Sequence, residues 1–162
     1  MKPYSLVMGS LLVLALAVIA WGKGTVFSIR DVDIELCQEK VLRIVAEKMG
    51  VELDPAIDRP RVVVDMPAEE FNAELYKMGV LTTLRPCSHH TYPIYFPRIN
   101  VIHLTPNSDL STLAHEYVHY LQVKYPKANM RGDGATPDWM EEQARKIQYW
   151  FWDTYVKKGN RP

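Results

Sequence analysis

The chain has 162 residues, of which 48% are hydrophobic and 23% are charged, and its formal net charge is zero. This length suits one domain with one core, and the composition is typical of a folded globular protein rather than a disordered one. Basic residues are interspersed with acidic ones and form no basic run, so no nucleic-acid partner is expected.

The first 24 residues are predicted to form a hydrophobic targeting segment. Lys2 precedes an apolar stretch from Leu6 to Trp21 that only a glycine and a serine interrupt. Its length falls between the apolar core of a signal peptide, about 7–15 residues, and a membrane-spanning helix, about 17–25 residues. Cleavage after Ala20 would secrete the protein, whereas Trp21 is typical of an anchor at the membrane interface. We expect export of residues 25–162 in either case and favour an uncleaved membrane anchor; a buried core helix is the alternative.

Residues 25–162 are expected to form one α+β domain, with a small sheet beside several helices. Helical spacing of apolar residues, together with caps and breakers, predicts helices over residues 30–49, 67–79, 108–125 and 136–157. The third of these helices is expected to start at Ser108 or Asp109. Runs of β-branched and aromatic residues predict strands over 61–65 and 92–104, the second bent at Pro97-Arg98 before a final strand, Ile99–Leu104.

The chain contains two cysteines, Cys37 and Cys87. An exported domain can pair them in a disulfide, but free buried cysteines are equally common, so both states stay open. Neither cysteine has a C-x-x-C neighbour, which argues against a thiolate zinc site or a redox motif.

The third predicted helix carries the segment His115-Glu116-Tyr117-Val118-His119. Residues four apart lie on one face of a helix, so the imidazoles of His115 and His119 can bind the same metal ion. Glu116 would lie close to that ion without being a ligand, and it can take a proton from a metal-bound water. This is the chemistry of the H-E-x-x-H motif, and two ordinary helix histidines are the alternative.

Tetrahedral zinc with an open position for water needs a third protein ligand. The metzincin extension of the motif has glycine and histidine downstream, but this chain has Gln122 and Tyr125 at those places, which excludes that variant. A carboxylate from a later helix is the other common source, and residues 140–145, Met-Glu-Glu-Gln-Ala-Arg, supply two candidates.

This later segment, following an H-E-x-x-H helix, resembles the E-x-x-A motif of gluzincin peptidases, a group of zincin metallopeptidases. By that resemblance Glu141 is the third zinc ligand, and Ala144 is the small residue that permits close helix packing. Glu142 is the competing ligand. Several gluzincins have an aspartate where this chain has Arg145. That aspartate supports a ligand histidine, so the resemblance does not imply the same support here.

The resemblance covers residues 99–152, roughly a third of the chain. It implies a minimal zincin-like domain of the kind found in small bacterial and phage proteins, with a short sheet, an active-site helix and a C-terminal ligand helix. It also implies that the strand Ile99–Leu104 is a sheet edge over the cleft, where an extended peptide could add as a further strand.

These features together predict a zinc metallopeptidase that acts on a peptide or protein substrate. His115, His119 and Glu141 would hold Zn2+, and Glu116 would be the general base. Two alternatives stay open: a zinc amidase that cleaves cell-wall peptides, and a non-catalytic, zinc-stabilised binding module at the membrane, which would have no use for Glu116. Zinc is the default metal for this ligand set, although other divalent ions also fit it.

Further histidines and aromatic residues are weaker candidates. His89 and His90 would line the cleft or be plain loop residues, and His103 is expected to be structural. Candidate oxyanion donors that are more often core residues are Tyr117, Tyr120 and Tyr125. The aromatic run from Tyr149 to Trp152, with Tyr155, is expected to form the buried or half-buried face of the last helix or a patch on the membrane surface.

Overall fold

A computed structural model describes residues 34–80, 92–125, 128 and 137–158 of the chain. The predicted targeting segment, Cys87 with its pairing to Cys37, and the neighbours His89 and His90 lie outside the described residues. Within the described part of the chain, no helix is long and apolar enough to cross a membrane.

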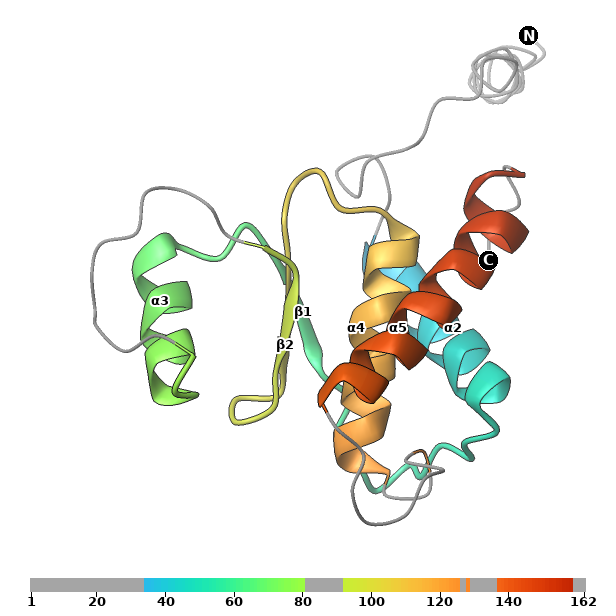
Figure 1. Cartoon of the computed structure of the whole chain (residues 1–162), viewed down its shortest axis with the longest axis horizontal. Coiled ribbons are helices and arrows are strands. Elements are labelled where there is room, and N and C mark those ends of the chain that lie inside the picture. The colour runs from blue at the N-terminus through green and yellow to red at the C-terminus, as the bar shows by residue number, and fades with distance from the viewer. Residues whose placement is uncertain (1–33, 81–91, 126–127, 129–136, 159–162) are drawn as a thin grey trace, which may run out of the picture.

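The described elements form an α+β domain, as the sequence predicts (Figure 1). In chain order they are α2 (Ile34–Met49), β1 (Arg61–Val64), α3 (Ala68–Lys77), β2 (Ile94–Phe96), β3 (Val101–Leu104), α4 (Leu110–Lys124), α5 (Pro137–Phe151) and the π-helical turn η4 (Trp152–Val156). The stretch predicted to bend at Pro97-Arg98 is a hairpin made of β2 and β3.

The three strands are ordered β1-β3-β2, with β1 parallel and β2 antiparallel to β3. A tight turn folds β2 back along β3, and in it Asn100 adopts a left-handed φ of 52°, which asparagine tolerates better than most residues. Helix α3 connects β1 to the hairpin, as a parallel pair requires a crossover. The expectation that the strand Ile99–Leu104 is a sheet edge is therefore wrong: β3 is the central strand, and β2 is an edge of the described sheet.

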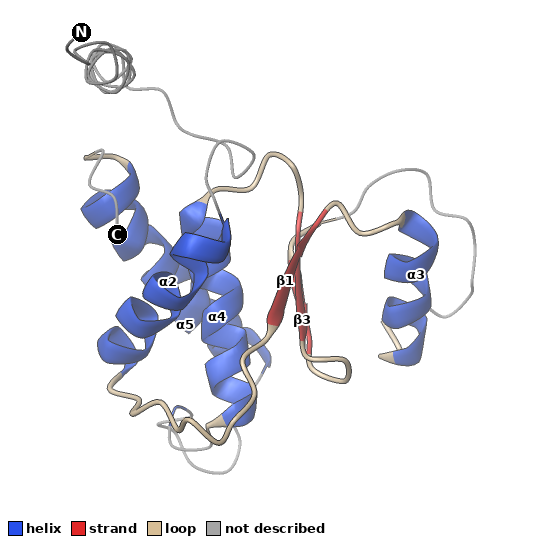
Figure 2. Ribbon diagram, turned by 180° about the vertical axis from the view of Figure 1, so that it is seen from behind, coloured by secondary structure: helices blue, strands red, loops and turns tan. Residues whose placement is uncertain are grey.

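Helices cover both faces of this sheet (Figure 2). On one face α3 packs through Phe71 and Leu75 against Phe96 of β2. On the other face α2, α4 and α5 form a larger layer, whose core includes Ile102 and Leu104 of β3. The alternation of side chains along each strand sends successive residues into these two separate cores.

Helix α4 carries the H-E-x-x-H segment and lies at the centre of the larger layer. Asp109 is its cap, because the carboxylate accepts hydrogen bonds from Thr112 N at 2.9 Å and Ser111 Oγ at 2.7 Å. Asp109, rather than Ser108, is thus the cap among the two candidates. Buried side chains occupy most of the helix, and Glu116 is among them, whereas the side chains of His115 and His119 are 13% and 22% exposed.

The last helix departs from the prediction of one α-helix up to residue 157. The α-helix ends at Phe151, and Trp152–Val156 form a π-helical turn in which Lys157 N donates to Trp152 O at 2.9 Å. The rings of Phe151 and Tyr155 lie 4.8 Å apart in this turn. Packing between aromatic side chains depends on the tertiary structure, which apolar periodicity does not report.

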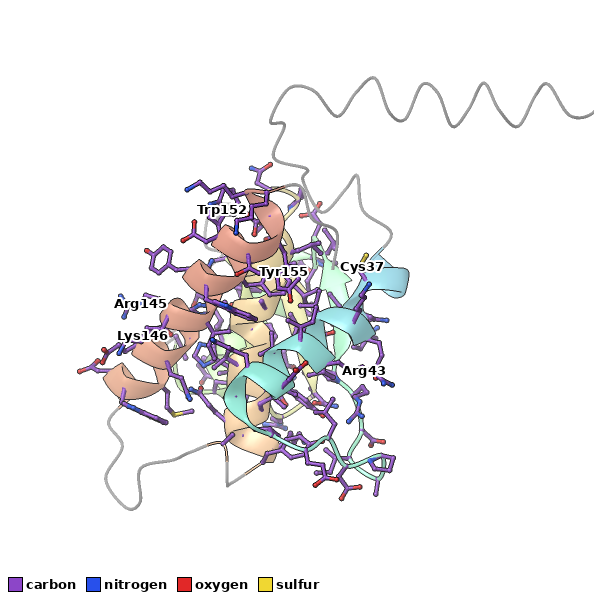
Figure 3. The ribbon with its side chains drawn as sticks, turned by 90° about the vertical axis from the view of Figure 1, so that its right-hand side faces the viewer. Cys37, Arg43, Arg145, Lys146, Trp152 and Tyr155 are labelled. Carbon is purple, nitrogen blue, oxygen red and sulfur yellow. The ribbon has the colours of Figure 1, made fainter. Side chains whose placement is uncertain are left out.

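The aromatic run of this helix is only partly in the core. Phe151 is fully buried, whereas Tyr149 is 68% exposed. Trp152 and Tyr155 are half-buried and lie at the same end of the domain as Cys37 (Figure 3). The expectation of a buried or half-buried aromatic face thus fails for Tyr149, whose position leaves its ring in solvent, and holds for the other members of the run: Trp150, Phe151, Trp152 and Tyr155.

Candidate metal centre

Helices α4 and α5 bring the three predicted ligand side chains together. The Nε2 atoms of His115 and His119 lie 3.1 Å apart. Glu141 Oε1 lies 3.4 Å from the first of these atoms, and Oε2 lies 3.2 Å from the second. Bonds of about 2.1 Å to a tetrahedral zinc ion place ligand atoms about 3.4 Å from one another. The spacing of the three side chains is therefore that of a metal site, and this group could hold a metal ion.

The charge state of His115 also suits metal binding. Burial lowers the pKa of His115, the neighbouring His119 lowers it further, and the carboxylate of Glu141 opposes both effects. A lowered pKa favours the neutral imidazole, which is the form that ligates metals. The carboxylate of Glu141 beside these nitrogens would attract a cation placed between them.

Glu141, rather than Glu142, is the carboxylate that faces the histidines. Glu142 is 60% exposed and pairs with Lys146 Nζ at 2.6 Å. Figure 3 shows Lys146 and Arg145 on the outer side of α5. Arg145 Nε lies 3.8 Å from Glu141 Oε1, so a cation stands beside the carboxylate of Glu141.

Ala144 has the surroundings that the resemblance implies. It is fully buried and belongs to the core shared by α4 and α5. A larger side chain at this position would push α5 away from α4, and Glu141 with it.

Two glutamines that the sequence analysis missed contact the outer nitrogens of the histidines. Gln122 Oε1 lies 3.0 Å from His119 Nδ1, and Gln148 Oε1 lies 3.1 Å from His115 Nδ1. Metal-binding histidines almost always use their second nitrogen for such a contact. Helical spacing could have indicated both residues, because Gln122 lies one turn after His119 and Gln148 lies two turns after Glu141.

Glu116 is almost completely buried beside the edge strand β2. It is 4% exposed, and its carboxyl accepts a hydrogen bond from the backbone N–H of Tyr95 in β2. Burial raises the pKa of Glu116 to about 8, although the hydrogen bond from Tyr95 lowers it and the negative charge of Glu141 raises it. Glu116 thus lies within electrostatic reach of the ligand cluster, with a carboxyl that can exchange a proton near neutral pH.

His103 has a structural position, as expected. It is fully buried in β3, its Nδ1 lies 3.0 Å from the backbone oxygen of Tyr92, and its ring lies 4.9 Å from that of Phe71 in α3. The side chain therefore lies on the sheet face that α3 covers, opposite the face covered by α4.

The three tyrosines considered as oxyanion donors belong to the core: Tyr117, Tyr120 and Tyr125. The hydroxyl of Tyr120 donates to Asp58 O at 3.0 Å, and the Tyr125 hydroxyl accepts from Asp54 N at 3.2 Å. Both hydroxyls thus hold the loop between α2 and β1 against α4.

Comparison of the chain with protein-family models and with curated proteins finds no match, and comparison with solved structures finds none either. The candidate site consists of the side chains of His115, His119 and Glu141, their two glutamine partners and the buried carboxyl of Glu116.

Proposed function

We propose that this protein is a zinc-dependent hydrolase of the gluzincin type, and specifically a metallopeptidase. The observation that carries the proposal is the convergence of His115, His119 and Glu141 at the spacing of tetrahedral ligands. Three protein ligands leave a fourth position for water or substrate, which is the arrangement of catalytic rather than structural zinc sites. Two imidazoles and one carboxylate favour zinc over the hard cations, which prefer oxygen ligands.

Glu116 is proposed as the general base. Zinc, when bound, would polarise the substrate carbonyl and lower the pKa of a coordinated water. A cation near Glu116 also favours its carboxylate form, so the pKa of about 8 in the metal-free site falls when the site is loaded. The ionised carboxyl would then accept a proton from the attacking water and donate it to the leaving amine.

The proposed substrate is an extended peptide or protein chain. The edge strand β2 supports this choice, because the N–H of its residue Tyr95 already meets Glu116. An extended peptide lying along this edge would present its carbonyl groups next to the base. The hydrophobic segment before residue 25 supports export, so we propose that substrates are met outside the cytoplasm.

The proposal is tested by replacing Glu116 with glutamine and assaying hydrolysis of a fluorogenic peptide library. Loss of a general base slows a reaction by about 100-fold to 10,000-fold, so E116Q should lose turnover to that degree while it still binds one zinc ion per chain. The matched control is E142Q, which changes an exposed glutamate on α5 and should keep full activity. Full activity in E116Q would refute the mechanism, and zinc binding without hydrolysis by the wild-type protein would favour the binding module.

A further inference from the structure

Gln122 is a buried glutamine with contacts at both ends of its amide. It is 1% exposed, and its Oε1 lies 3.0 Å from His119 Nδ1. On the other side its Nε2 donates to the backbone oxygen of Met140 at 3.0 Å and to Gln143 Oε1 at 2.8 Å. A single side chain of α4 thus connects a ligand histidine to the first turn of α5, which carries Glu141.

The contact with Met140 fixes the orientation of this amide. A backbone carbonyl oxygen can only accept hydrogen bonds, so the group that faces Met140 must be the NH2 of Gln122. The oxygen of Gln122 must then face His119, and the hydrogen bond exists only if His119 Nδ1 carries the proton. In the neutral imidazole His119 Nε2 then has the lone pair, and it lies 3.2 Å from Glu141 Oε2 on the cluster side.

We propose that Gln122 is a positioning residue that holds His119 in the Nδ1–H tautomer and fixes the distance between His119 and Glu141 before any metal arrives. This inference rests on the proposed zinc site and names Gln122 as the residue that orients its ligand His119. Because the amide is neutral, it orients the imidazole without adding the negative charge that a carboxylate partner would supply. Gln122, one of the two residues that exclude the metzincin motif, thus has a role of its own in this site.

The corresponding contact at His115 is less constrained. Gln148 is half-buried, and its Oε1 lies 3.1 Å from His115 Nδ1. Among the described residues, no backbone carbonyl accepts a hydrogen bond from this amide, so either orientation of Gln148 satisfies the geometry. Gln122 is therefore expected to matter more for metal binding than Gln148 does.

The test uses the full chain and two readouts. The variant Gln122→Met keeps the length of the side chain and removes its hydrogen bonds. We expect zinc affinity, measured by competition with a chromogenic chelator, to fall by about 10-fold to 100-fold. Gln38→Met, a change on α2, which carries none of the cluster residues, is the matched control and should keep wild-type affinity. Wild-type affinity in Gln122→Met would overturn the inference.

The second readout is the tautomer of His119 in the metal-free protein, measured by ¹⁵N NMR at mildly alkaline pH. We expect the Nδ1–H form in the wild-type protein and a mixture in Gln122→Met; an Nε2–H form in the wild type would overturn the inference. If Gln122→Met does not fold, Gln143→Met, which removes one of the two anchors of the amide, should show a smaller loss of affinity. Failure of the wild type to bind zinc would refute the proposed function alone, because the tautomer is measured without metal.

Discussion

Burial of Glu116 should make the metal-free protein less stable as the pH rises. The pKa of this carboxyl is raised from 4.5 to about 8 in the folded protein, mainly by burial. Between these two values the unfolded chain has lost the proton while the folded chain still holds it, so the folded state becomes less favourable with increasing pH. The stabilising contribution of the protonated, buried carboxyl is complete below pH 4.5 and is lost as the pH rises to about 8.

The magnitude follows from the linkage of protons to folding. One proton corresponds to about 1.4 kcal/mol per pH unit, so the loss reaches about 3 kcal/mol at neutral pH and about 5 kcal/mol at pH 8. Domains of this size are stable by about 5–15 kcal/mol in total. The metal-free protein should thus be marginal in alkaline solution, and a bound cation should restore its stability because it favours the ionised carboxyl.

The variant E116Q removes this titration and provides the assay. Urea unfolding with a metal chelator at about pH 5, 7 and 9 should show that E116Q gains stability relative to the wild type by about 5 kcal/mol across the series. E142Q is the control and should follow the wild-type profile, because Glu142 is exposed. Parallel pH profiles for E116Q and the wild type would refute the assignment of a buried, protonated carboxyl to Glu116.

Three further substitutions test the packing that holds the site. Ala144→Leu should overpack the fully buried α4–α5 contact, cost about 1–3 kcal/mol in urea unfolding and weaken zinc binding; unchanged zinc affinity would contradict the packing role. Asp109→Ala should remove the cap of α4 and cost about 1 kcal/mol, and a neutral result would mean that Thr112 N finds another acceptor. Phe71→Ala should cost about 3–5 kcal/mol yet leave the zinc affinity of the folded protein unchanged, because α3 covers the opposite sheet face; a large loss of affinity would show that the two layers are coupled.

The local features of this protein could be predicted from its sequence. Asp109 caps α4, and the four-residue spacing of His115 and His119 places them on one face of that helix. The resemblance to the gluzincin motif selected Glu141, and the geometry brings that residue rather than Glu142 to the histidines.

The remaining features depend on contacts between distant parts of the chain. The central position of β3 is set by pairing with both β1 and β2, which the composition of a single strand does not report. The partner of His119 is one helical turn away, but the role of Gln122 depends on the carbonyl of Met140 in another helix. The pKa of Glu116 likewise reflects the elements packed around α4, whereas the sequence shows only that a glutamate is present.

The metal content of the purified protein tests the central claim most directly. Zinc would be quantified by mass spectrometry in the wild type, in Glu141→Ala and in Glu142→Ala after supplementation with zinc and removal of free metal. The account predicts about one zinc ion per chain in the wild type and in Glu142→Ala, and loss of the metal in Glu141→Ala, which lacks one of three protein ligands. A wild-type protein that holds no metal, or a Glu141→Ala variant that holds as much zinc as the wild type, would contradict it.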